Sequence, residues 1–170
     1  PFDSHSVSVS SDTLGTLKLS GEGGASASSA IDTTAAGDIW DNFDGSIGAT
    51  SGAKVKNTEG GDNSIYYTLP SIMDGLAINL SYEPQGSNAE SATGYGLAYT
   101  GVEGLSLKYA VTDHETGTSS TSGDDTVIMA EYAYGPITVS ASEKDYDVDT
   151  SNDQEVSSYQ VSYTISDELS

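Results

Sequence analysis

The stretch "GGDNSIYYTLPSIMDGLAINLSY", Gly60 to Tyr82, decides the fold because it contains two runs of strict alternation. Apolar or aromatic residues occupy positions 65, 67 and 69 in the first run and every second position from Leu76 to Tyr82 in the second. A period of two places such residues on one face of a β-strand and the intervening residues on the other. Both segments are therefore predicted strands with one apolar and one polar face. The apolar face could cover a soluble core, or it could contact lipid.

Composition narrows the classes of protein that this chain can be. Its 170 residues suffice for one domain. The 26 acidic and 5 basic residues give a formal charge of −21, which disfavours binding to nucleic acid and to anionic membrane surfaces. The absence of cysteine excludes a disulfide framework. The longest apolar run, Val127 to Ala130, is far shorter than the ~20 residues of a membrane-spanning helix.

Alternation along the rest of the chain predicts nine strands joined by connections of two lengths. The strands cover roughly 4–10, 15–21, 64–69, 75–83, 93–100, 104–112, 126–134, 136–144 and 156–165. Short turns such as "PSIMDG" and "YGP" alternate with long polar connections at roughly 22–62, 84–92, 113–125 and 145–155. An up-and-down sheet then has all its short turns at one end and all its long loops at the other. Transmembrane β-barrels have this asymmetry.

The two faces of the predicted strands agree with a barrel in a membrane. Eight of the 11 tyrosines fall on the apolar faces, mostly toward strand ends, where a ring is buried and its hydroxyl reaches water. Tyrosine also favours strands in general, so this cue alone leaves both alternatives open. The polar faces carry mainly Ser, Thr, Asn, Gln and Lys, which suit a water-filled lumen. We expect one set of residues to face lipid: Leu76, Ile78, Leu80, Leu105, Leu107 and Tyr109. We expect another set to face the lumen: Ala77, Asn79, Ser106 and Lys108.

Two motifs sharpen this expectation. "LGTLKLSG", Leu14 to Gly21, is followed after a long connection by "DNSIYYTLPS", Asp62 to Ser71. This arrangement resembles the general-diffusion porins of Gram-negative outer membranes, in which similar strands flank the constriction loop. The segments "YTGVEGLSLKYAV", "AEYAYGPITVSAS" and "YQVSYTISDELS" are similar to successive porin hairpins.

The resemblance implies an all-β, antiparallel up-and-down transmembrane β-barrel in the bacterial outer membrane. Family members are sixteen-stranded homotrimers, so we expect residues 1–170 to form a partial barrel of about nine strands, with 22–62 as the constriction loop. The implied function is a passive channel for small hydrophilic solutes and ions, without enzymatic activity or a cofactor. The implied partners are outer-membrane lipid and lipopolysaccharide, two further copies of the chain and the solutes themselves, but no nucleic acid.

The resemblance also suggests which residues line the pore. Within "GDIWDNFDGS", three aspartates spaced three apart would share one face of a helical turn and form an acidic eyelet that concentrates cations. The predicted constriction residues are Glu22, Asp32, Asp38, Asp41 and Asp44. The other interpretation is an external, solvated loop. The predicted lumen-facing wall comprises Lys18, Tyr66, Lys108 and Lys144. Tyr66 stands where the family usually has a pore-facing arginine, so we expect the channel to prefer cations.

Other candidate sites are weaker. "DYDVDTSNDQE" places Asp145, Asp147, Asp149 and Asp153 near the spacing of a calcium loop, but it lacks the glycine and the final glutamate, so we predict a solvated loop and no metal. His5 and His114 have no sequence partner for catalysis. The alternative function is a secreted or surface β-sandwich that acts as an adhesion or carbohydrate-binding module.

Overall fold

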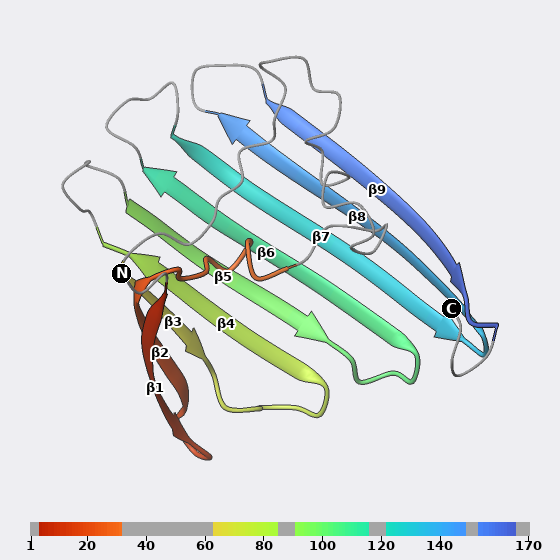
Figure 1. The fold of residues 1–170 in the computed structure, drawn as a ribbon, viewed down its shortest axis with the longest axis horizontal. Helices are drawn as coiled ribbons and strands as arrows, with labels where there is room; N and C mark the ends of the chain where they lie inside the picture. Colours follow the sequence, from red (N-terminus) through yellow and green to blue (C-terminus); the bar gives the residue numbers. More distant parts are fainter. Residues whose placement is uncertain (1–3, 32–62, 85–90, 116–121, 149–152, 166–170) are drawn as a thin grey trace.

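The computed structural model describes residues 4–31, 63–84, 91–115, 122–148 and 153–165. Within these ranges the chain forms a single sheet of nine antiparallel strands in sequence order, with the short turns gathered at one end (Figure 1). The strands are β1 (His5–Ser11), β2 (Gly15–Glu22), β3 (Ser64–Thr68), β4 (Leu76–Glu83), β5 (Ser91–Tyr99), β6 (Leu105–Glu115), β7 (Gly123–Tyr134), β8 (Ile137–Val148) and β9 (Gln154–Tyr163). The predicted all-β, up-and-down architecture is confirmed. The sheet is open, as a partial barrel would be.

Three strands extend at least three residues further than the alternation predicted. Strand β6 continues to Glu115, β7 begins at Gly123 and β8 continues to Val148. The predicted connections at 113–125 and 145–155 are therefore partly strand, and Asp145 and Asp147 lie within β8. These extensions were missed because acids replace apolar residues there. Backbone pairing still holds them, with Asp113 opposite Asp124 and Asp124 opposite Asp147.

Strand register assigns every second residue to one face across the whole sheet. On one face Leu17 pairs with Tyr67, Tyr67 with Leu80, and Leu80 with Tyr95. The residues expected to contact lipid lie together on this apolar face, and those expected to face the lumen lie together on the opposite face, as the alternation predicted.

Burial is reversed relative to a soluble protein. Large side chains of the apolar face are exposed, among them Leu19, Leu80, Leu97 and Leu107. The buried side chains of the strands come from the other face and are mostly small or polar: Ser20, Ser64, Ser81, Ala92, Ala110, Thr112, His114, Asp125, Val127, Ser140, Ser142, Tyr146 and Val148. An apolar face of this extent in contact with water would be unfavourable, so it requires another solvent or a partner.

The offset between strands gives their tilt. Through Tyr99, Leu107 and Ala130, Leu76 at the start of β4 is in register with Ala141 of β8. Strand β8 begins at Ile137, four residues before Ala141. If the strands start at a common level, four residues of ~3.4 Å over four strand spacings of ~4.8 Å correspond to a tilt of about 35°. Transmembrane barrels have tilts in this range. The same offset explains why the apolar face ends at Ala141 on β8 but continues to Tyr82 on β4.

The short turns depend on glycine at positions where the backbone is left-handed. Gly75 and Gly104, each with φ of +76°, directly precede β4 and β6. A Cβ at Gly104 would lie 2.3 Å from the carbonyl oxygen of Ala133 on β7. Only glycine combines this φ with such a close approach without strain.

The two faces should respond differently to charge. Replacing Leu107 with Arg on the apolar face is expected to destabilise the folded protein by about 2–4 kcal/mol, because a charge at this depth enters hydrocarbon. Replacing the adjacent Ser106 with Arg, on the opposite face, should have a much smaller effect. Urea titrations of the protein refolded into phosphatidylcholine vesicles measure both values. Equal losses would contradict the assignment of the faces.

Candidate functional site

The candidate site is the polar face of the sheet, which we call the polar wall. One row of paired residues crosses all nine strands and defines it: Ser8, Lys18, Tyr66, Ser81, Gly94, Thr112, Asp125, Tyr146 and Gln154. Every second residue from this row along each strand belongs to the same wall. Hydroxyl groups predominate on β1 to β3, where Thr16 donates to Ser10 with an Oγ1–Oγ distance of 3.0 Å. The polar wall is therefore a hydrophilic surface with few charged side chains.

The lysines expected on the lumen wall lie on this face. Lys18 and Tyr66 are adjacent in the defining row. Lys108 and Lys144 belong to neighbouring rows of the same wall. Glu22, at the end of β2, is exposed and pairs with His5. Asp32, Asp38, Asp41 and Asp44 lie outside the described residues.

The segment that follows β2, Gly23 to Ile31, lies over the polar wall (Figure 1). The backbone N–H of Ala27 donates to Oγ of Ser81 on β4, at 2.9 Å. The N–H of Ser28 donates to Oγ1 of Thr112 on β6 at 3.2 Å, and the hydroxyls of Ser28 and Thr112 are 2.7 Å apart. Ala27 and Ser28 are almost completely buried. Two wall hydroxyls thus satisfy backbone donors that would otherwise be buried unpaired.

Strand β5 makes room for this segment. Its residues on the polar wall are all small: Ala92, Gly94, Gly96 and Ala98. A Cβ at Gly94 would lie 2.6 Å from Oγ of Ser81 and 2.7 Å from Oγ1 of Thr112, the two hydroxyls that hold the segment. A side chain at Gly94 would displace at least one of them.

The segment Gly23 to Ile31 is also stabilised by a turn within itself. The N–H of Ala30 donates to the carbonyl oxygen of Ser26 at 3.1 Å. Ser26 and Ser29 exchange hydrogen bonds, since the N–H of each donates to the hydroxyl of the other at 2.8 and 3.1 Å. Serine hydroxyls commonly close turns in this way.

A buried ion pair crosses from β7 to β8 on the same wall. Nζ of Lys144 is 3.5 Å from Oδ2 of Asp125, and their side chains are 12% and 0% exposed. A buried carboxylate is costly unless a cation lies beside it. The charge of Lys144 is consequently offset locally, so it contributes little to the field across the lumen.

Sequence reasoning missed the residues that organise the wall. Asp125 was assigned to a loop, and Ser81, Thr112 and Gly94 were ordinary strand positions. One signal was available: "SATGYGLAY" places small residues at alternate positions from Ala92 to Ala98. Such a stripe marks a close approach of another chain segment. Its partner, 23–31, could not be identified from the pattern.

Carboxylates gather on the apolar-face side of the loop-end extensions, beyond the apolar residues. There the negative charge of Asp153, followed by that of Asp145 and Asp124, raises the pKa of the Asp147 carboxyl above its usual value. Within the described ranges, no three His, Asp or Glu side chains are grouped as a metal site would require. In the same part of the chain, no helix is long and apolar enough to cross a membrane.

The sheet is open and up-and-down, its apolar face is exposed, and its polar wall holds the segment Gly23 to Ile31. This is the architecture of a channel wall in the outer membrane. A sequence model of the Gram-negative porins matches residues 2–168, and the chain belongs to this family. It is therefore an outer-membrane protein of the porin channel type, in agreement with the resemblance. No curated protein and no solved structure matches the chain.

We expect the position of the segment 23–31 to depend on Gly94. Gly94→Val is expected to displace Ser81 or Thr112, release Ala27 and Ser28, and change the single-channel conductance in planar bilayers. Overpacking should also lower the stability by about 1–3 kcal/mol. Thr93→Val, on the opposite face of the same strand, is the matched control and should leave the conductance unchanged. If both variants conduct like the wild type, the segment does not depend on Gly94.

We expect the buried ion pair to stabilise the folded protein as a coupled unit. Lys144→Met should destabilise the protein by about 3–5 kcal/mol, because Asp125 would remain buried without its cation. Lys144→Met combined with Asp125→Leu should recover most of this loss. Thermal unfolding in detergent micelles, followed by circular dichroism, measures both. A double variant no more stable than the single one would show that the pair is not a coupled unit.

Proposed function

We propose that the protein is a passive, cation-preferring porin for small hydrophilic solutes and ions. The observation that carries this proposal is the charge balance of the polar wall. Within the described strands, the wall carries three lysines and four carboxylates: Lys18, Lys108, Lys144, Glu22, Glu83, Asp125 and Glu131. Lys144 and Asp125 offset one another. A wall so nearly neutral presents no cationic surface to attract anions.

The remaining sequence adds negative charge to this background. The chain contains five lysines and no arginine against 26 acidic residues. Where a porin commonly has an arginine, this wall has Tyr66. Acidic residues in the connection after β2 would then outnumber its two lysines, Lys54 and Lys56. Two unit charges ~4 Å apart interact by about 1 kcal/mol in bulk water and by about 4 kcal/mol at an effective dielectric near 20. Carboxylates in a narrow passage therefore act on passing ions more strongly than carboxylates on open loops.

We also propose that residues 22–62 form the constriction loop, with Glu22, Asp32, Asp38, Asp41 and Asp44 at the constriction. Two observations support this assignment. The loop's first residues, Gly23 to Ile31, lie against the polar wall and not over the rim of the sheet. The residues that follow include three aspartates spaced three apart.

The family further supports a homotrimeric assembly in contact with outer-membrane lipid and lipopolysaccharide. In this proposal 1–170 contributes part of each barrel. The exposed apolar face supplies the surface that lipid or neighbouring copies would cover.

Selectivity tests the proposal. In planar bilayers with a KCl gradient, the reversal potential should indicate cation preference, and this preference should weaken as salt screens the charges. Asp38→Asn, Asp41→Asn and Asp44→Asn combined should reduce the preference, because they remove the acids of the proposed eyelet.

The matched control removes three acids elsewhere: Asp145→Asn, Asp147→Asn and Asp149→Asn combined. This triple variant should leave the reversal potential nearly unchanged. Equal reductions from both triple variants would mean that diffuse negative charge sets selectivity and that the proposed eyelet is wrong. A wild-type preference for anions would reject the proposed cation selectivity.

A further inference from the structure

A small cavity lies between the segment Gly23 to Ile31 and the polar wall. Its volume is about 10 Å³. The residues that line it include Ser26, Ser64, Ser81, Glu83 and Ala92. Three hydroxyl groups and one carboxylate thus surround the cavity. A single water molecule needs about 10–15 Å³ of accessible space, so the cavity has room for one.

The cavity lies where the two ends of the connection between β2 and β3 meet. Ser26 follows the end of β2, and Ser64 is the first residue of β3. The ends also meet through the backbone, because the N–H of Asn63 donates to the carbonyl oxygen of Gly21 at 3.3 Å. Asn63 has a φ of +62°, a left-handed conformation that asparagine adopts more readily than most residues. A group bound in the cavity would therefore contact both ends of the connection.

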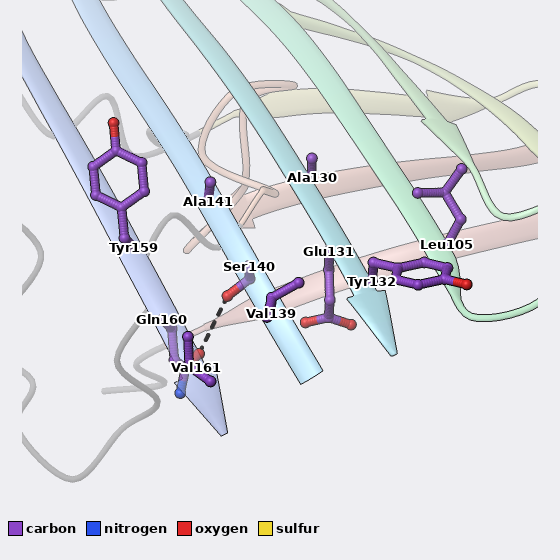
Figure 2. Close-up of a pocket in the computed structure, with 10 residues that line it drawn as sticks. All are labelled: Leu105, Ala130, Glu131, Tyr132, Val139, Ser140, Ala141, Tyr159, Gln160 and Val161. Carbon is purple, nitrogen blue, oxygen red and sulfur yellow. Dashed lines mark hydrogen bonds between the residues drawn. The ribbon is translucent and has the colours of Figure 1, made fainter. Parts of the chain in front are cut away.

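The side chain of Ser64 indicates that such a group is bound. It is only 4% exposed, and its Oγ has no hydrogen-bond partner in the described part of the chain. Elsewhere on the polar wall a buried serine bonds to the next strand, since Oγ of Ser140 donates to Oε1 of Gln160 at 3.3 Å (Figure 2). Buried hydroxyls without a protein partner are commonly satisfied by ordered water. The Ser64 hydroxyl therefore requires a partner inside the cavity.

The hydrogen atoms of these hydroxyls favour water over a metal ion. A cation would bind Oγ of Ser64 but would leave its hydrogen without an acceptor, because no described side chain accepts it. Water can accept this hydrogen and donate one of its own. Oγ of Ser81 already accepts from the N–H of Ala27, so Glu83 is the stronger acceptor in the lining. A carboxylate has about four acceptor sites and can take this bond besides others.

We propose that the cavity binds one water molecule, which accepts a hydrogen bond from Ser64 and donates one to Glu83. The water joins β3 to β4 directly below Ser26. It is a buried structural ligand that holds the start of the connection after β2 against its end. This hydration site depends on contacts of the described residues and is independent of the proposed cation preference.

A crystal structure of the protein tests the proposal directly. Electron density for one water should lie within about 3.2 Å of Oγ of Ser64 and of the Glu83 carboxylate. A cavity without density overturns the proposal. Crystals soaked in thallium(I) acetate provide the control for a cation. An anomalous peak in the cavity would assign a monovalent cation instead and would also overturn the proposal.

Two substitutions at Ala92, whose side chain lines the cavity, test what the water contributes. Ala92→Ser should displace the water, supply a hydroxyl partner for Ser64 and leave the midpoint of thermal unfolding in detergent micelles nearly unchanged. Ala92→Val should displace the water without replacing its hydrogen bonds and lower the midpoint by about 3–6 °C.

The matched control is Ala98→Val, on the same strand and face but outside the cavity, which should unfold like the wild type. A lower midpoint for Ala92→Val alone supports the proposal. Equal midpoints for Ala92→Val and Ala92→Ser would show that no water satisfies Ser64 and would overturn it. An equal loss in Ala98→Val would assign the effect to crowding of the wall and would overturn it as well.

Discussion

The structure depends on the pairing of backbone hydrogen-bonding groups between strands. In hydrocarbon no water is available to N–H and C=O groups, so a spanning chain must satisfy them internally, and antiparallel strands do so through their neighbours. Side chains then alternate between two solvents. This is why Leu80 and Leu97 are exposed on one face while Ser81 and Thr112 are buried on the other. The reversed burial follows from the solvent and not from weak packing.

The same alternation lets one strand serve two purposes. On its apolar face β5 carries Tyr95, Leu97 and Tyr99, which are suited to lipid. On the polar wall it carries Ala92, Gly94, Gly96 and Ala98, which make room for Gly23 to Ile31. The chain segment that lies against the wall is held by hydroxyls of the strands on either side. Lipid contact and the shape of the lumen are therefore encoded in the odd and even positions of one short segment.

Charge is distributed according to depth and face. Carboxylates of the apolar face appear only beyond the apolar residues, at the loop ends of β6 to β9, where like-charge repulsion raises the pKa of Asp147. On the polar wall a buried carboxylate has a lysine beside it. Elsewhere the polar wall consists mostly of hydroxyl-bearing and small side chains. The polar wall is therefore nearly neutral within the described strands.

The amino-acid sequence by itself determined the strands, their faces and their up-and-down order, because alternation and loop length are local properties. Its resemblance to the porins also identified the family. Strand ends at Glu115, Gly123 and Val148 were misjudged, since acids on an extended strand give no apolar signal. The seat of Ala27 and Ser28 on Ser81 and Thr112, and the pairing of Asp125 with Lys144, depended on the tertiary structure. These contacts join residues brought together by strand register or by the path of a loop, and no local periodicity encodes that path.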